Sequence, residues 1–315
     1  MEILIRSAVL ALLVAGAACE FVPPPTFIET PRDRLIVHSV LSAGSDTVKV
    51  LLTIPAPKWS ADYNPLRVGG ATVRLSGGGR EVTLLEAPAG FSDCTAPSNF
   101  GSPGPQQLGA VQLGCYAAVL PGGVLHATRY TLRVEAPGRE VVTGETLVPT
   151  EPEWISFPEQ HAVQVSWSSG SALSLPLELR WRTAAAATEI PPVWTERIFR
   201  GGRQIEGRCV MVPIRSDGTL FTTNSARTDS VQIRILLANC RSADASPGQP
   251  LLQPDSAYAS ILLSAYDQSY AAHAQDRARG SSSTRSASPG LSGAYGVFGS
   301  VAIQAKRLVL IASGS

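Results

Sequence analysis

The chain has 315 residues and a formal net charge of +1, and only 16% of its residues are charged. A near-neutral chain offers no electrostatic basis for binding nucleic acid, and this length is sufficient for two ordinary domains. The 28 glycines and 24 prolines are typical of a β protein rich in turns, so we expect an all-β fold class.

The first 18 residues have the three parts of a secretory signal. Arg6 gives a positive start, an apolar core of about a dozen residues follows, and the small residues 15–18 precede Cys19. This pattern is typical of bacterial lipoproteins, so we expect cleavage before Cys19 and acylation of its sulfur. Two or more acyl chains anchor a protein stably, which predicts an outer-membrane lipoprotein on the periplasmic face or at the cell surface. Gly16 stands where such signals usually carry leucine, and ordinary cleavage would instead release a soluble secreted protein.

The cysteine count agrees with a lipid on Cys19. Four cysteines then remain, an even number that suits disulfides in an oxidising compartment. The most economical pairing joins Cys94 to Cys115 and Cys209 to Cys240, although the sequence permits three pairings. Free buried thiols are the alternative. A metal site is disfavoured, because there is no C-x-x-C and no histidine lies within a few residues of a cysteine.

After the lipid anchor and proline-rich spacer at 19–32, residues 33–149 are predicted to form an immunoglobulin-like or prealbumin-like β-sandwich. Runs of β-branched residues, or of alternating apolar and polar residues, predict strands over 34–41, 47–54, 71–76, 80–85, 130–135 and 140–147. Glycine-containing turns join 71–76 to 80–85 and 130–135 to 140–147, so each of these two pairs is expected to form a hairpin. A loop rich in Ser, Pro and Gly spans 93–114, and a Cys94–Cys115 bridge would close its base. Such a loop is either a simple insertion or a functional element.

Residues 150–160 are predicted to be a linker, and residues 161–315 a second β-rich domain. Its expected strands are 161–167, 176–183, 193–200, 209–214, 231–237, 258–263, 297–303 and 308–311. A helix over 264–279 is predicted from Tyr266, Tyr270 and His273, which recur at helical spacing. A Ser-rich loop is expected over 281–292.

Known catalytic motifs are absent from the sequence. It contains no H-E-x-x-H, no G-x-S-x-G elbow and no phosphate-binding G-x-x-x-x-G-K-[ST], and no two histidines have metal-ligand spacing. The acidic residues are scattered: Asp62, Asp93, Asp217, Asp229, Asp255, Asp267 and Asp276. A glycosidase needs only two carboxylates that meet in space, so an enzyme with an unrecognised site stays open.

Four tryptophans gather in the second expected domain: Trp154, Trp167, Trp181 and Trp194. At strand positions tryptophans are more often core residues than a ligand platform. An exposed pair of them would be a candidate binding surface.

Several short segments follow one another in a distinctive order. Cys19 is followed by Gly70–Val73 at the opening of the first glycine-turn hairpin, then by Tyr130–Val134, Thr146–Pro149 and Gly296–Gly299. In this order they resemble a family of bacterial surface lipoproteins, domain of unknown function 4249, which is common in Bacteroidota. Such proteins are often encoded beside TonB-dependent outer-membrane receptors. The resemblance therefore implies a partner role in nutrient capture and no catalytic residue.

The leading hypothesis is a non-enzymatic lipoprotein, held in the lipid bilayer through acylated Cys19, that assists ligand binding or uptake beside a TonB-dependent receptor. We expect neither a cofactor nor a metal, and the sequence identifies no ligand-binding residue. One alternative is a secreted or surface hydrolase with an unrecognised carboxylate site. The other is an adhesin or structural surface protein.

Overall fold

The structure is a computed structural model. It describes residues 34–55, 66–87, 94, 114–157, 163–165, 177–191, 193–206, 210–211, 213–214, 221–222, 228–235, 255–278 and 289–312. Several predicted features lie outside these residues: the signal peptide with Cys19 and the spacer, both cysteines of the expected Cys209–Cys240 pair, and most of the Ser-rich loop over 281–292.

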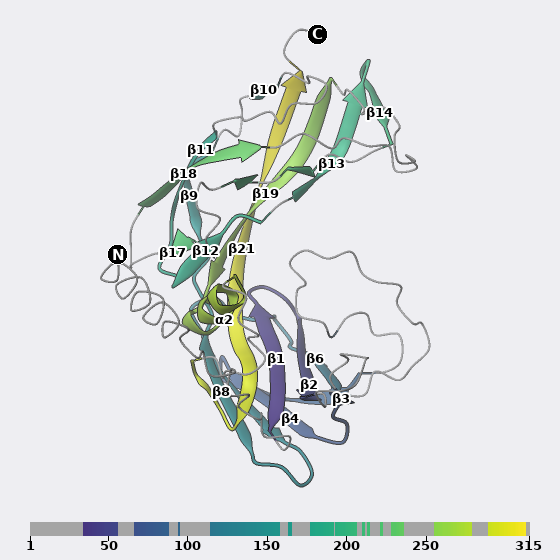
Figure 1. The fold of residues 1–315 in the computed structure, drawn as a ribbon, viewed down its shortest axis with the longest axis vertical. Helices are drawn as coiled ribbons and strands as arrows, with labels where there is room; N and C mark the ends of the chain where they lie inside the picture. Colours follow the sequence, from purple (N-terminus) through teal and green to yellow (C-terminus); the bar gives the residue numbers. More distant parts are fainter. Residues whose placement is uncertain are drawn as a thin grey trace, which may run out of the picture. The chain divides into compact units, whose positions relative to one another are not determined.

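The chain is nearly all-β, as predicted from its turn-rich composition (Figure 1). The first eight strands are β1 (Leu35–Ser42), β2 (Thr47–Ile54), β3 (Leu66–Arg67), β4 (Thr72–Gly77), β5 (Arg80–Glu86), β6 (Cys115–Val119), β7 (Arg129–Glu135) and β8 (Val142–Leu147). The next ten are β9 (Glu153–Ser156), β10 (Val163–Val165), β11 (Leu177–Arg182), β12 (Ala187–Glu189), β13 (Val193–Arg200), β14 (Arg203–Ile205), β15 (Val210–Met211), β16 (Pro213–Ile214), β17 (Phe221–Thr222) and β18 (Thr228–Ile235). Then come β19 (Ser256–Tyr266), helix α2 (Gln268–Ala278), β20 (Leu291–Ser292) and β21 (Ala294–Ala312).

The described strands form a mixed 17-stranded sheet and a smaller four-stranded sheet, in which β18 and β11 lie between β16 and β9. The C-terminal strand β21 joins distant parts of the large sheet. Its first half pairs in parallel with β1, from Ala294 opposite Leu35 to Val301 opposite Ser42. Its second half pairs antiparallel with β19, as far as Ile311 opposite Ser256. The two C-terminal strands that we expected over 297–303 and 308–311 are therefore one continuous strand.

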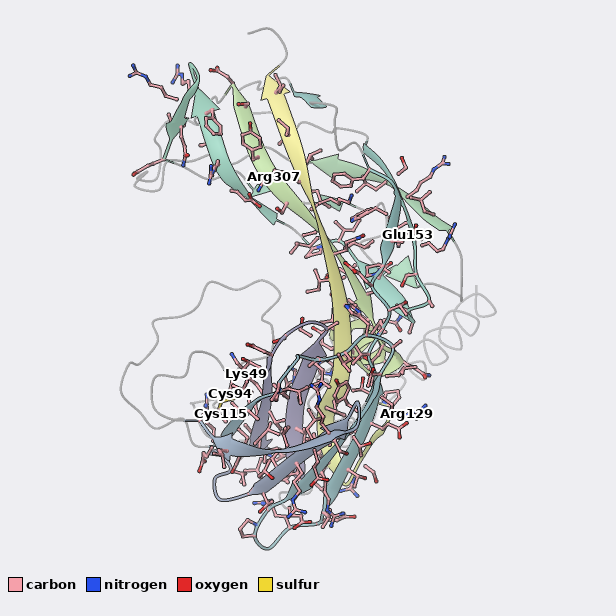
Figure 2. The ribbon with its side chains drawn as sticks, turned by 180° about the vertical axis from the view of Figure 1, so that it is seen from behind. Lys49, Cys94, Cys115, Arg129, Glu153 and Arg307 are labelled. Atoms are coloured by element: carbon pink, nitrogen blue, oxygen red, sulfur yellow. A yellow bond between two sulfur atoms is a disulfide. The ribbon has the colours of Figure 1, made fainter. Side chains whose placement is uncertain are left out.

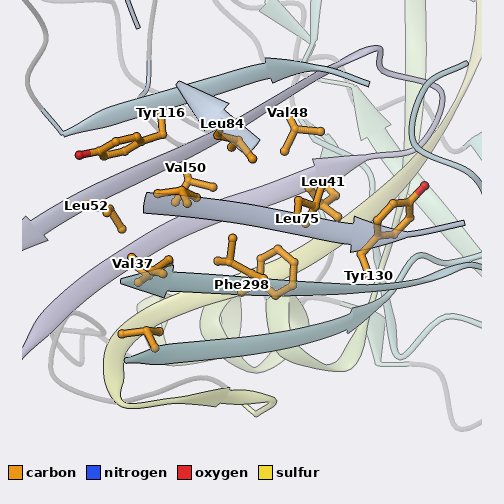
Figure 3. Close-up of a cluster of buried hydrophobic side chains, with 14 of the residues drawn as sticks. Val37, Leu41, Val48, Val50, Leu52, Leu75, Leu84, Tyr116, Tyr130 and Phe298 are labelled. Carbon is orange, nitrogen blue, oxygen red and sulfur yellow. The ribbon is translucent and has the colours of Figure 1, made fainter. Parts of the chain in front are cut away.

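A buried cluster occupies the space between two groups of strands (Figure 3). β1, β2, β6 and β21 contribute side chains such as Val37, Val50 and Phe298, while β4 and β7 contribute Leu75 and Leu132. Alternate residues are buried in β7, which is the pattern of a strand with one face on a core. Since Phe298 comes from the C-terminal strand, the end of the chain completes a core that begins at residue 35. The immunoglobulin-like or prealbumin-like topology stays a prediction.

Residues 32–315 group into one compact unit by their contacts. The domain boundary that we placed at 150–160 stays a prediction, but pairing of β21 with both β1 and β19 connects the two sides of that boundary.

Helix α2 is shorter than the predicted helix over 264–279. It begins at Gln268, because residues up to Tyr266 continue β19 opposite β21. Tyr270 and Ala271 of the helix pack against Val297 and Val301 of β21. Among the described residues, no helix has the length and apolar character needed to cross a membrane.

The disulfide between Cys94 and Cys115 is present (Figure 2). The two Cα atoms lie 5.5 Å apart, and both residues are buried beside Ala87. Cys115 is the first residue of β6, so the bridge fixes residue 94 against the sheet on which β6 pairs with β2.

Candidate functional site: a pocket at the start of helix α2

The described residues enclose a pocket of about 640 Å³, here called the α2 pocket. Four segments surround it: the facing parts of β7 and β8, the chain after β8, a run of alanines before β12, and the start of α2 with the turn before β20. Its lining residues are Ala127, Arg129, Glu145, Thr146, Leu147, Val148, Pro149, Thr150, Ala184, Ala185, Ala186, Asp267, Gln268, Ser269, Pro289 and Gly290.

Asp267 is the buried carboxylate of this pocket, and it caps the N-terminus of α2. Oδ1 accepts the backbone N–H of Tyr270 at 3.0 Å, and Oδ2 accepts that of Ser269 at 3.2 Å. An aspartate in this position satisfies N–H groups that have no partner within the helix. The same carboxylate accepts the Ser300 N–H at 2.9 Å and the Thr146 hydroxyl at 2.9 Å. It therefore connects α2, β8 and β21.

The backbone of β21 approaches this carboxylate closely because residue 299 is a glycine. A Cβ added to Gly299 would lie 2.8 Å from the Tyr270 Cβ and 3.0 Å from Asp267 Oδ1. A larger residue would push the strand away from the helix. Burial raises the pKa of Asp267 above its ordinary value, while the hydrogen bonds from Ser300, Tyr270, Thr146 and Ser269 act in the opposite direction.

The walls of the pocket consist largely of small residues. Ala184, Ala185 and Ala186 form one side, and their backbone is held in place where Ala186 donates to the Tyr266 carbonyl at 3.0 Å. Short side chains leave the volume open. Leu147 also lines the pocket and is 53% exposed, so the pocket contains accessible apolar surface.

The exposed charged groups of the pocket are Arg129 and Glu145, whereas the Asp267 carboxylate is buried. Arg129 of β7 forms an ion pair with Glu145 of β8, and the two side chains are 63% and 49% exposed. An ion pair this exposed contributes little to stability, so both groups are accessible to a ligand at small cost. The position of Arg129 on the surface is visible in Figure 2.

An aromatic cluster lies beside α2. Tyr270 stacks on His273 with 6.2 Å between ring centroids, and His273 meets His38 of β1 edge-on at 5.6 Å. Tyr266 packs against Tyr270 at 4.8 Å and donates to the Glu189 carboxylate. Burial, followed by the negative charge of Glu189, raises the pKa of the Tyr266 hydroxyl. These rings connect β1, β19 and α2, which is a packing role.

The tryptophan side chains that the structure describes form no exposed pair, in agreement with the core role that the sequence favours. Trp181 is fully buried and meets the partly buried Trp154 edge-on, with 6.1 Å between ring centroids. Trp167 lies outside the described residues, as does the side chain of Trp194. His161 and Asp62, Asp93 and Asp217 also lie outside them.

From the sequence, Asp267 was only one of seven scattered aspartates, and its position at the start of a helix was not recognised. The available signal was an aspartate directly before Gln268, Ser269 and Tyr270, which is a helix N-cap pattern. Among the described residues, no group of three or more His, Cys, Asp or Glu side chains is arranged to hold a metal ion.

Comparison with known proteins gives one finding. No curated protein matches the chain. A family model described as Domain of unknown function (DUF4249) matches residues 23–178, a range that includes β1 to β9, the family-like segments at 70–73, 130–134 and 146–149, and the first part of the α2 pocket. The chain belongs to the family Domain of unknown function (DUF4249).

Proposed function

We propose that this protein is a cell-envelope lipoprotein that binds a small ligand in the α2 pocket without transforming it. The observation that carries the proposal is the pocket itself. Its volume of about 640 Å³ lies within the range of roughly 300–1,000 Å³ that is usual for small-molecule sites.

Binding is favoured over catalysis by the state of the buried acid. Both oxygens of Asp267 already accept hydrogen bonds from neighbouring protein groups, four in all. A general acid or base must exchange a proton with a substrate within hydrogen-bond reach, and this carboxylate is engaged in holding three elements together. The Ser269 hydroxyl likewise donates to the Pro289 carbonyl.

The lining indicates the kind of ligand. Alanines, prolines and Leu147 suit an apolar group, while the cation of Arg129 and the anion of Glu145 are placed to meet polar ends at the rim. The proposed ligand is thus a small amphiphilic molecule with its polar part at the entrance.

The test is a thermal-shift screen of small metabolites against the chain from residue 19 with Cys19→Ser. Hits are repeated on a variant with Ala184→Trp and Thr150→Trp, because both exposed residues line the pocket and an indole there would occupy its space. The control carries Thr143→Trp and Ala305→Trp, two exposed strand positions away from the lining. Hits that stabilise the pocket variant as strongly as the control would refute the pocket as the binding site.

The apolar run before Cys19 supports the proposed localisation in the cell envelope, and the family resemblance supports a TonB-dependent receptor as the proposed partner. Acylation is measured as an increase in the mass of the protein purified from its native membrane, and Cys19→Ser should abolish this increase. Purification from gently solubilised outer membranes should recover a receptor. Repeated absence of any such receptor would count against this partner.

A hydrolase is the second candidate, because two carboxylates, Asp267 and Glu145, line the same pocket. The raised pKa of Asp267 suits an acid that is protonated more readily than usual. Turnover on a panel of glycosides and esters that is lost in Asp267→Asn and in Glu145→Gln, with folding preserved, would favour this function over simple binding.

A further inference from the structure

Only part of the outer edge of β8 carries backbone hydrogen bonds in the residues that the structure describes. β7 pairs with the whole of β8 on one side. On the other side β20 pairs with Thr143 and Gly144, and the Gly290 carbonyl accepts the Glu145 N–H at 2.8 Å. β8 itself continues to Leu147, which lines the α2 pocket together with Glu145 and Gly290. The outer edge of the strand therefore borders the pocket at its end.

Strand geometry directs the main-chain groups of Leu147 to this outer edge. Residues of an antiparallel strand alternate between bonding to one neighbour and bonding to the other. Glu145 donates outward to Gly290, and Val148 donates inward to the chain just before β7, so Leu147 has the outward orientation of Glu145. Among the described residues, none accepts the Leu147 N–H, and the Leu147 C=O accepts the Ser300 hydroxyl at 3.3 Å.

A donor and an acceptor at a strand edge are the groups to which an added strand binds. The bond from Ser300 to the Leu147 carbonyl is longer than the usual O–H···O distance, and a carbonyl oxygen has a second lone pair. A peptide group could therefore accept the Leu147 N–H and donate to the Leu147 C=O. Such a group would continue the line of β20 along β8.

Opposite charges lie beside the same main-chain groups. Arg129 is opposite Leu147 in the register of β7 and β8, and Glu145 lies two positions before Leu147 in the same strand. A free peptide has an ammonium at one end and a carboxylate at the other, so each end finds an opposite charge at the rim. The exposed ion pair between Arg129 and Glu145 contributes little to stability, so a ligand can separate the two groups at small cost.

The interior of the pocket suits apolar side chains more than a molecule rich in hydroxyl groups. Its buried polar side chains are already bonded to protein groups: Thr146 to Asp267 and Ser300, and the Ser269 hydroxyl to the Pro289 carbonyl. The alanines at 184–186 offer short apolar side chains. A sugar would need several side-chain partners, whereas a peptide needs main-chain groups and apolar contacts.

We propose that the α2 pocket binds a short apolar peptide with free termini, which adds to β8 as a strand in line with β20. This inference rests on the proposed function and names the class of its ligand. One amide of the peptide bonds to both main-chain groups of Leu147. The peptide carboxylate meets Arg129, its ammonium meets Glu145, and an apolar side chain packs on the alanines.

The experiment titrates the chain from residue 19, with Cys19→Ser, by calorimetry with pools of tripeptides composed of alanine, valine and leucine. We expect binding, and we expect N-methylation of one of the two peptide amides to weaken it about tenfold, because one hydrogen bond is lost. Acetylation and amidation of the two ends should also weaken it, and should do so much less when Arg129→Gln and Glu145→Gln are combined.

Leu147→Pro removes the proposed donor without removing a bond to β7, and proline is tolerated where a strand N–H faces outward. Leu147→Ala is its matched control, because alanine also lacks the leucine side chain but keeps the N–H. The proline variant should bind the peptide about tenfold more weakly than the alanine variant. Circular dichroism checks that both are folded.

Hydrogen exchange of single amides, followed by NMR in the unsubstituted chain, tests the same bond without a substitution. Saturating peptide should slow exchange of the Leu147 amide at least about tenfold, because exchange then requires the peptide to leave. The Thr146 amide faces β7 and should change little. Unchanged exchange at Leu147, or equal affinity of the proline and alanine variants, would overturn the proposal.

Failure of this inference can be told apart from failure of the proposed function. If no tripeptide binds while a metabolite from the screen is lost in the Ala184→Trp and Thr150→Trp variant, the pocket is a ligand site but not a peptide site. If tripeptides bind that variant as tightly as the Thr143→Trp and Ala305→Trp control, the peptide does not enter the pocket, and both proposals are contradicted.

Discussion

Phe298→Ala tests whether the C-terminal strand belongs to the core that begins at β1. Phe298 is fully buried among side chains from several strands, and it leaves so little space that a Cβ on Gly144 of β8 would lie 2.8 Å from its ring. A site enclosed on all sides cannot collapse into the space that a lost ring leaves. We therefore expect the free energy of unfolding to fall by about 3–5 kcal/mol, the range for removal of a buried aromatic side chain.

The assay is urea unfolding followed by two probes, far-UV circular dichroism and tryptophan fluorescence. Four of the five tryptophans lie between residues 154 and 194, so fluorescence reports the part of the chain that follows β8. If β21 couples the strands before residue 150 to those after it, Phe298→Ala should lower the urea midpoint equally in both probes. The control is Ile303→Ala on the same strand, where the side chain is 44% exposed and the loss should stay below about 1 kcal/mol. A cost for Phe298→Ala as small as that of the control, or a shift in one probe only, would refute the reasoning.

Three further predictions concern the buried polar groups and the disulfide. Burial raises the pKa of the Asp267 carboxyl, so the native state binds this proton more tightly than the unfolded chain does. The protonated carboxyl therefore stabilises the fold fully below pH 3.8, the ordinary pKa, and this stabilisation is lost as the pH rises through the native pKa. The free energy of unfolding of the wild type relative to Asp267→Asn should accordingly fall with rising pH, and a difference that grows with pH would contradict this. Replacing Cys94 and Cys115 by serine should cost about 3 kcal/mol in chemical denaturation, because the bridge closes a loop across 21 positions; an unchanged midpoint would argue against the bridge. Tyr116→Phe should cost about 1–2 kcal/mol, since it leaves the Ala71 N–H without its acceptor at 2.9 Å, and a neutral result would show that this N–H finds another partner.

Local patterns predicted the hairpins well. The glycine turn after Ser76 gave the expected strands 71–76 and 80–85, and the structure has Thr72–Gly77 and Arg80–Glu86. Gly78 and Gly79 both have positive φ, which is the conformation that such a turn requires. The disulfide of Cys94 was likewise predictable, because its partner is the nearest cysteine along the chain.

Pairing between distant strands determines the bounds of β19, β21 and α2, which could not be predicted from local sequence patterns. Gln304, Lys306 and Arg307 interrupt the apolar pattern of the C-terminal strand, but β19 lies opposite them and pairs with every residue, so the strand continues. The same pairing keeps Tyr266 in β19, although its spacing from Tyr270 suits a helix. Neither effect is visible without knowing which strands are neighbours.

The α2 pocket could not be predicted from the sequence either, because it is assembled from segments that are far apart in the chain. The α2 pocket draws on segments near residues 129, 147, 185, 268 and 290, and each of them is unremarkable in sequence. Asp267 acquires its role only when Thr146 and Ser300 are brought to its carboxylate by β8 and β21.

Ligand binding in the α2 pocket is tested most directly by the dissociation constant of the first ligand identified in the screen, determined by calorimetry. The chain with Ala184→Trp and Thr150→Trp should bind at least about tenfold more weakly than the wild type, while the Thr143→Trp and Ala305→Trp control should bind as the wild type does. Equal affinity in all three proteins would contradict binding in the α2 pocket, because the ligand would then bind elsewhere on the protein.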